Sequence, residues 1–332
     1  MNKVAIMILT KNRADFMIRQ LQYYKAVKSP HPVYILDSSD NQDADKIKDY
    51  ISQNKEPKTT YLWTESGNQP FNKLLALSNE KYACFSGDDD YQIPDSLSEC
   101  AKFLESNPDF VSCGGKAVTV RIQANEVYGK IERISDYPRK EILYDLPEER
   151  FLNLMNNYCV YLFNVTRTET HKKMWDYLFH FSDPMVEIYP VSQLVIDGKV
   201  KLIDNLQFIR QIHKKNNNLG STVNWLATHF KDSYAQIKTR LPIPEKYIEL
   251  GFEYLIRNSL NKYPSSLDTK PRKQSLNLRT SMANKFPILK RIYRRHIKPT
   301  FSWEVTQEDS KYHHSFKNVE DSVLGKFNLY PD

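Results

Sequence analysis

Short apolar runs, each ended by a polar turn and followed by a helical pattern, are the feature that most constrains how this chain folds. Five such runs predict buried strands, at 4–9, 33–36, 60–63, 82–86 and 110–113. Helices are predicted after Asp15, over 42–53 and 71–78, and after Pro94. The chain has 332 residues, 40% of them apolar, which is enough for a large core.

Strands that alternate with helices in units of about 25–30 residues predict an α/β fold, a mostly parallel sheet with helices on both faces. Right-handed crossovers make such a sheet open and doubly wound, and its ligands bind at the carboxyl ends of the strands. Polar clusters at 10–13, 37–40 and 88–90 follow three of the predicted strands. We therefore expect these clusters to meet at one edge of the sheet.

The alternation loosens beyond residue 120. Gly114 and Gly115 are expected to close the strand at 110–113, and the charged segment 121–146 to form a loop or hairpin. Later helices are expected at 146–157, 168–181, 184–197 and within 222–260. Later strands are expected at 159–165, 200–203 and 206–209.

Several classes of protein are excluded by motifs that the sequence lacks. It holds only 9 glycines, and neither G-x-G-x-x-G nor G-x-x-x-x-G-K-[ST] occurs, which excludes those dinucleotide and phosphate loops. The 4 cysteines include no C-x-x-C pair, which favours a reducing compartment and a cytoplasmic protein. No run approaches the ~18 apolar residues of a membrane span, so we expect a soluble or peripheral protein.

Asp88, Asp89 and Asp90 directly follow the predicted strand at 82–86. Adjacent carboxylates repel one another unless a cation relieves the repulsion. A hard divalent ion, Mn²⁺ or Mg²⁺, takes carboxylate oxygens and keeps positions open for phosphate oxygens. The alternative is a solvated acidic turn that caps the next helix. The position at a strand end, shortly before Pro94, favours the metal site.

Four segments resemble the family-2 glycosyltransferases of GT-A fold, which use nucleotide-sugar donors. They are VAIMILTKNRADFMIRQL, VYILDSSD, NKLLALSNEKYACFSGDDDYQIPDSL and FVSCGGKAV. The resemblance is good over residues 3–118 and extends weakly to 213. We expect a catalytic domain over 1–215, with a nucleotide-sugar-binding half (1–118) and an acceptor half (119–215). A mainly helical region over 216–332 would follow.

The resemblance implies a nucleotide-sugar site built from several strand ends. Its residues are Thr10, Asn12, Arg13, Asp37, Ser39, Lys73, Asp88, Asp89 and Arg210. Asp37 either accepts the imide hydrogen of uracil, which suggests a UDP-sugar, or only shapes its turn. Arg13 either pairs with the diphosphate or lies on the helix surface. The family's first motif aspartate falls on Gly87, so the metal ligands would be Asp90 with either Asp88 or Asp89.

An inverting transferase needs a carboxylate that takes the proton of the acceptor hydroxyl. In the family pattern, counting back from Gly198 places this base at Glu187. Asp183 is the rival, and its alternative role is to cap a helix. His213 would be a metal ligand with Asp88 and Asp90, or a structural histidine. Arg210 would neutralise charge on the leaving group.

The segment 286–298 interleaves isoleucine, leucine and tyrosine with lysine and arginine, and the whole chain has a net charge of +7. As a helix the segment would be amphipathic and cationic, which suits an anionic membrane surface on the inner face of the cell membrane. The alternative is a helix whose apolar stripe packs on the catalytic domain. Nucleic-acid binding has no supporting motif.

The expected function is metal-assisted transfer of a sugar from a nucleotide donor to a glycan or a lipid-linked acceptor. A sugar-phosphate nucleotidyltransferase would use the same acidic cluster, but such enzymes typically carry a glycine-rich first loop, and segment 10–13 contains no glycine. A third alternative is a non-catalytic protein of the same fold that binds carbohydrate or a membrane surface.

Overall fold

The computed structural model describes residues 2–54, 58–65, 71–123, 126–175, 185–213, 234–235, 237–262 and 300–327. Two features expected from the sequence, the rival base Asp183 and the basic segment 286–298, lie outside these residues. No described helix has both the length and the apolar character needed to cross a membrane.

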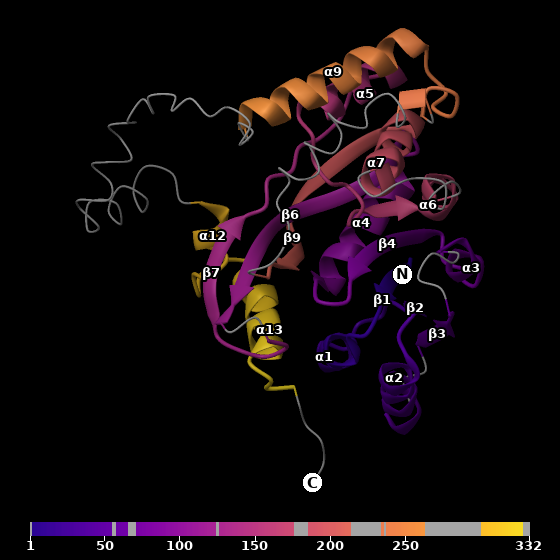
Figure 1. Cartoon of the computed structure of the whole chain (residues 1–332). Coiled ribbons are helices and arrows are strands. Elements are labelled where there is room, and N and C mark those ends of the chain that lie inside the picture. Colours follow the sequence, from indigo (N-terminus) through magenta and orange to yellow (C-terminus); the bar gives the residue numbers. More distant parts are fainter. Residues whose placement is uncertain are drawn as a thin grey trace, which may run out of the picture.

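A nine-stranded sheet forms the centre of the molecule (Figure 1), in the order β3-β2-β1-β4-β8-β6-β9-β5 with β7 beside β6. The strands are β1 (Val4–Thr10), β2 (Val33–Asp37), β3 (Thr59–Trp63), β4 (Tyr82–Gly87), β5 (Tyr91–Gln92), β6 (Phe110–Ile122), β7 (Ile131–Asp136), β8 (Val165–Arg167) and β9 (Lys199–Gln211). The first four in the sheet are parallel, and so are β6 and β9. The shorter strands β5, β7 and β8 pair antiparallel with their neighbours. The predicted α/β fold is thus confirmed.

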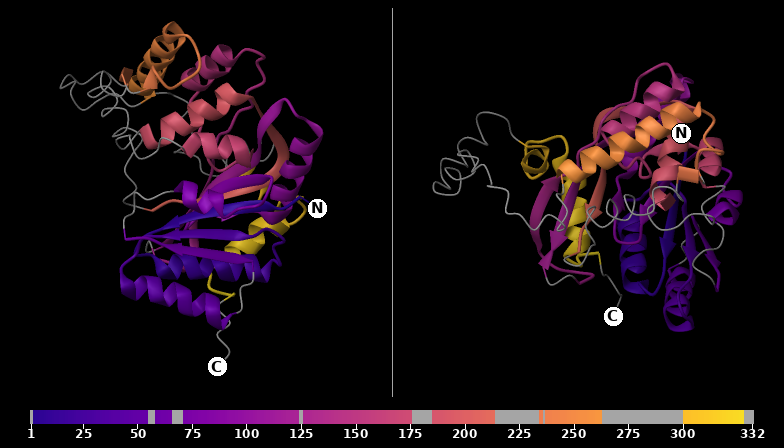
Figure 2. Two further views of the ribbon diagram at one scale, coloured as in Figure 1. Left: turned by 90° about the vertical axis from the view of Figure 1, so that its right-hand side faces the viewer. Right: turned by 45° about the horizontal axis from the view of Figure 1, so that its top comes forward.

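Helices cover both faces of this sheet (Figures 1 and 2). They are α1 (Ala14–Ala26), α2 (Asn41–Gln53), α3 (Phe71–Ala76), α4 (Pro94–Ser106), α5 (Pro147–Asn156), α6 (Thr168–Trp175), α7 (Met185–Asp197), α9 (Glu245–Lys262), α12 (Phe301–Glu304) and α13 (His313–Val323). On one face, α1, α2, α4 and α13 pack with Val4, Ile6 and Ile8 of β1. On the other, α3, α5, α6, α7 and α9 pack with Ala5 and Met7. Because successive strand residues point to opposite faces, β1 serves both cores and is a continuous apolar run.

The C-terminal described segment, residues 300–327, packs in the same core as α1, α2 and α4. Tyr91 of β5 reaches Ser322 of α13, with 3.1 Å between the two hydroxyl oxygens. Five buried side chains near and on α13 join the same core as β1, namely Val305, Tyr312, Phe316, Val319 and Val323. Part of the region 216–332 therefore completes the core of the sheet instead of standing apart from it.

Some predicted strand boundaries are wrong, and packing explains why. Gly114 and Gly115 do not end a strand but lie inside β6, where neighbouring groups leave no room for a Cβ. Segments 200–203 and 206–209 form one strand, β9, whose pairing with β6 shifts in register beside Lys116. Of the run 159–165, only Val165 enters the sheet. The segment 121–146 contains β7, which forms the predicted hairpin with the end of β6.

We predict that Gly115→Ala destabilises the protein more than Gly114→Ala does. A Cβ on Gly115 would lie 2.5 Å from the backbone oxygen of Asn205, which cannot move without distorting β9. The three atoms nearest to a Cβ on Gly114 all belong to the side-chain amide of Asn164, which can rotate away. We expect Gly115→Ala to cost about 1–3 kcal/mol of unfolding free energy, measured by urea denaturation. Equal or reversed costs would contradict this account of the two glycines.

Candidate active site

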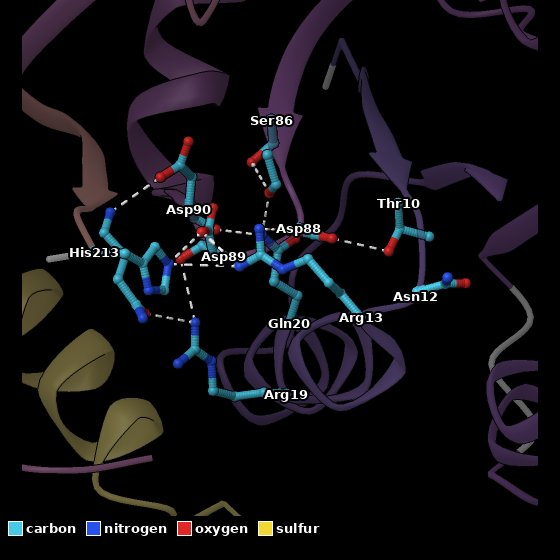
Figure 3. A network of polar contacts seen from close by, with 12 residues as sticks. Thr10, Asn12, Arg13, Arg19, Gln20, Ser86, Asp88, Asp89, Asp90 and His213 are labelled. Carbon is cyan, nitrogen blue, oxygen red and sulfur yellow. Dashed lines mark hydrogen bonds and ion pairs between the residues drawn. The ribbon is translucent and has the colours of Figure 1, made fainter. Parts of the chain in front are cut away.

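The polar clusters predicted to meet do so at the carboxyl ends of β1, β2 and β4. In the parallel pairings Thr10 lies opposite Asp37, and Leu9 lies opposite Gly87. Asp88, Asp89 and Asp90, which we call the acidic turn, therefore lie beside the loop that follows β1. Figure 3 shows this turn between Thr10, Arg13 and His213.

Asp88 is held by the loop that follows β1. The Thr10 hydroxyl donates a hydrogen bond of 2.9 Å to Asp88 Oδ2, and Arg13 Nη1 lies 3.1 Å from Asp88 Oδ1. Burial raises the pKa of Asp88 to about 6, although the charge of Arg13 opposes this shift.

Asp89 is shared between Arg13 and His213. Arg13 Nη2 and His213 Nε2 each lie 2.7 Å from Asp89 Oδ2. Burial by itself would raise the pKa of Asp89, but the hydrogen bond to His213 and the charge of Arg13 lower it. The Arg13 guanidinium thus bridges two carboxylates, and its side chain is 35% exposed whereas that of Asp88 is 6% exposed. Arg13 is therefore the solvent-facing member of this cluster.

Asp90 lies deeper, with 4% of the residue exposed. Its Oδ1 accepts a hydrogen bond of 3.0 Å from the backbone N–H of Gln211. Burial and the neighbouring charge of Asp89 raise the pKa of Asp90, and the charge of Arg210 opposes them. The ligand set of Asp88, Asp90 and His213 stays a prediction, and in the structure the aspartate that contacts His213 is Asp89.

The acidic turn suits a divalent ion that is shared with a bound phosphate. Within the described ranges, no three His, Cys, Asp or Glu side chains are grouped so as to enclose a metal ion. The Asp89 carboxylate and the His213 ring nevertheless converge. Mg²⁺ and similar hard ions commonly take one or two protein ligands and complete their shell with phosphate oxygens and water. The residues fit such an ion and not a closed protein cage.

The Asp37 carboxylate forms its own turn. Asp37 Oδ1 accepts from Ser39 N at 2.7 Å, and Asp37 Oδ2 accepts from the Tyr61 hydroxyl at 2.6 Å. Asp37 is 0% exposed, so of its two possible roles the structure displays the turn-forming one. Asn12, at φ 53°, donates its N–H to Ser39 Oγ at 2.7 Å and so ties the loops after β1 and β2 together.

Glu187 lies in the first turn of α7, and its Oε1 accepts a hydrogen bond of 2.9 Å from the Tyr158 hydroxyl. Burial raises the pKa of Glu187, while Tyr158 and the charge of Arg210 lower it. The charge of Arg210 lowers the pKa of both Glu187 and Asp90. Arg210 Cζ lies 5.9 Å from the ring centres of Tyr137 and Phe163. The predicted base and the acidic turn thus share one cation.

Two residues of this centre, Arg19 and Gln20, were not predicted from the sequence, and one predicted residue, Lys73, makes no described contact with it. Arg19 and Gln20 of α1 contact the backbone of the acidic turn, but they occupy a helix whose pattern indicated only burial. Lys73 is exposed on α3, and none of its contacts with described residues joins it to the acidic turn.

Comparison with known proteins supports the fold. No protein-family model matches the sequence, and no curated protein matches it. Residues 1–349 of TarS from S. aureus match with a TM-score of 0.51 at 11% identity, over 98% of this chain and 91% of that one. The same part of TarS in complex with UDP matches with a TM-score of 0.51, and in complex with UDP-GlcNAc with 0.50, both at 13% identity and over the same shares of the two chains. TarS is a glycosyltransferase. The chain therefore has a GT-A-like fold, which it shares with these TarS structures.

Proposed function

We propose that this protein is a metal-assisted glycosyltransferase that moves a sugar from a UDP-sugar to a hydroxyl group of a glycan or lipid-linked acceptor, with inversion. The observation that carries the proposal is the single polar centre at the ends of β1, β4 and β9, where Arg13, Asp89 and His213 converge. The TarS structures of this fold include complexes with UDP and UDP-GlcNAc, which supports a UDP-sugar as the donor.

The donor half of the proposal rests on the charges around the acidic turn. Asp89 and His213 would hold a Mn²⁺ or Mg²⁺ ion, with Asp88 next to them. Such an ion stabilises the negative charge of the departing diphosphate. Arg13 would leave the carboxylates and pair with diphosphate oxygens, for which a guanidinium is well suited. Arg210 would supply a second cation near the same place.

The acceptor half of the proposal rests on Glu187. Its Oε1 is engaged by Tyr158, so Oε2 would take the proton of the acceptor hydroxyl. As this proton moves to Glu187, the acceptor oxygen bonds to the anomeric carbon, and the bond from that carbon to the diphosphate oxygen breaks. One carboxylate that acts as a base, on the side away from the leaving group, is what inversion requires.

We predict that UDP with Mn²⁺ raises the melting temperature and that Asp89→Asn removes most of the rise. A ligand at about 100 times its Kd stabilises the folded state by about 2.7 kcal/mol. Asp89→Asn loses a charged ligand atom and the ion pair with Arg13. Differential scanning fluorimetry measures the shift. Asp95→Asn, an exposed carboxylate on α4 close in sequence, serves as the control and keeps the rise. An unshifted wild-type melting curve at millimolar UDP and Mn²⁺ would reject the proposed ligands.

For Arg13→Met we predict opposite effects on the two ligands. Removal of the guanidinium leaves Asp88 and Asp89 without their shared cation, so Mn²⁺ alone binds more tightly. UDP loses a charge-assisted contact of about 1.5–3 kcal/mol and binds about tenfold or more weakly. Calorimetry with each ligand separately measures both changes.

Lys46→Met is the matched control for the lost charge, because Lys46 pairs with Asp15 on the exposed surface. It should change neither affinity. If Arg13→Met weakens Mn²⁺ and UDP alike, Arg13 does not compete with the metal ion.

Tyr158→Phe is predicted to move the acidic limb of the pH–rate profile to higher pH. Tyr158 donates a hydrogen bond to the ionised Glu187 and lowers its pKa, whereas burial raises it. Loss of the hydroxyl therefore raises the pKa further, and the base becomes ionised only at higher pH. Slow hydrolysis of UDP-sugars, followed between pH 5 and pH 9, measures the profile.

Glu187→Gln is the companion variant for this profile. It should lower the rate by about 10²–10⁴-fold and remove the limb, with donor affinity kept. An unchanged limb in Tyr158→Phe together with full activity in Glu187→Gln would exclude Glu187 as the base.

A further inference from the structure

Two polar side chains of α1 lie buried directly beneath the acidic turn. Arg19 is 1% exposed and Gln20 is 0% exposed. The amide of Gln20 is not needed to fill space, because methionine has nearly the same length as glutamine and buries no polar atoms. Burying the guanidinium of Arg19 is costly unless its donors are paired. A buried guanidinium and a buried amide at consecutive positions therefore call for an explanation from their contacts.

These contacts are with the backbone of the acidic turn. The Gln20 amide donates to the carbonyl oxygens of Gly87 and Asp90. Arg19 Nη2 donates to the carbonyl oxygen of Asp89 at 3.2 Å. Carbonyl groups throughout the turn are thus held toward α1 (Figure 3). Since a peptide unit is planar, fixing these carbonyls also fixes the backbone from which the carboxylates project.

Arg19 also connects the turn to two other elements. Its Nη2 donates to Gln211 Oε1 at 2.8 Å, and its Nη1 donates to the carbonyl oxygen of Val127. Gln211 is the residue whose N–H binds the Asp90 carboxylate. The rings of Phe16 and Tyr91 lie 5.1 Å and 5.2 Å from Arg19 Cζ and restrict the guanidinium. Arg19 therefore fixes the acidic turn relative to the end of β9, close to His213.

We propose that Arg19 and Gln20 are positioning residues that hold the acidic turn in the conformation that binds a divalent ion together with UDP. This inference rests on the proposed function. Neither residue touches the ligand. They act through the backbone of the turn, as outer-shell partners orient the direct ligands of a metal ion.

The test measures Mn²⁺ binding to the full chain in the presence of saturating UDP, by the EPR signal of free Mn²⁺. UDP binding without metal and the melting temperature are measured in parallel. Gln20→Met removes both amide contacts and keeps the volume. The control is Gln22→Met on the same helix, 8% exposed, whose Oε1 accepts only a 3.3 Å hydrogen bond from Tyr128 among its described contacts.

We expect Gln20→Met to weaken Mn²⁺ binding by about 10–100-fold, the usual cost of losing an outer-shell partner. UDP binding without metal should stay close to that of the wild type, and Gln22→Met should bind Mn²⁺ normally. Arg19→Lys keeps the charge but not the forked donors, so it should fall between wild type and Gln20→Met. If Gln20→Met does not fold, the comparison of Arg19→Lys with Gln22→Met decides the question.

Equal Mn²⁺ affinity in wild type, Gln20→Met and Arg19→Lys overturns this inference alone, even if both variants melt at lower temperature. Such a result would show that the two residues only stabilise the core. A wild-type chain that binds no Mn²⁺ with UDP overturns the proposed function and this inference with it.

Discussion

The repulsion among three consecutive aspartates is the constraint around which this structure is arranged. Each carboxylate is stabilised by different partners: Asp88 by Thr10 and Arg13, Asp89 by Arg13 and His213, and Asp90 by the backbone of Gln211. These partners come from the ends of β1 and β9 and from the loops beside them. Because these three acids are adjacent and buried, they need such partners, and the partners come together here from distant parts of the chain.

The cations around the acidic turn differ in how freely they can move. Arg13 is about one-third exposed, whereas Arg19 is 1% exposed and confined between two rings. A ligand that contains both a metal cation and phosphates offers new partners to both sides of these ion pairs. The cation can pair with the aspartate carboxylates, and the phosphates can pair with the Arg13 guanidinium. Arg13 can exchange partners in this way at little cost, while Arg19 keeps the turn from following it. Under the proposed function, the same repulsion thus favours both order in the free protein and binding of a metal ion with a diphosphate.

The sequence was sufficient where local chemistry determines the structure. Buried parallel strands are continuous apolar runs, so β1, β2 and β4 and the polar turns after them were predictable. The prediction that Gly114 and Gly115 end a strand was wrong, because glycine can either end a strand or allow another group to approach closely within it. Only the positions of Asn164 and Asn205 in the folded chain show which of these roles applies. Likewise, spacing cannot tell which of three adjacent acids faces His213. The contacts of Arg19 and Gln20 with the acidic turn were not predicted, because hydrophobic periodicity shows that a helix face is buried but not which groups that face contacts.

The alternation of β9 links the two halves of the candidate site. Ile209 and Gln211 face α1, where Ile209 joins the first core and Gln211 binds Arg19. Phe208 and Arg210 face the other side, where Phe208 stacks on Phe163 at 4.1 Å and Arg210 acts on Glu187. A slip of one residue would exchange these faces, moving Arg210 into the first core and Gln211 toward Glu187. The short strand β5 opposes such a slip, since it pairs Tyr91 with Ile209 immediately after the acidic turn. The register of β9 therefore positions both the backbone N–H that binds Asp90 and the Arg210 cation that acts on Asp90 and on Glu187, the proposed base.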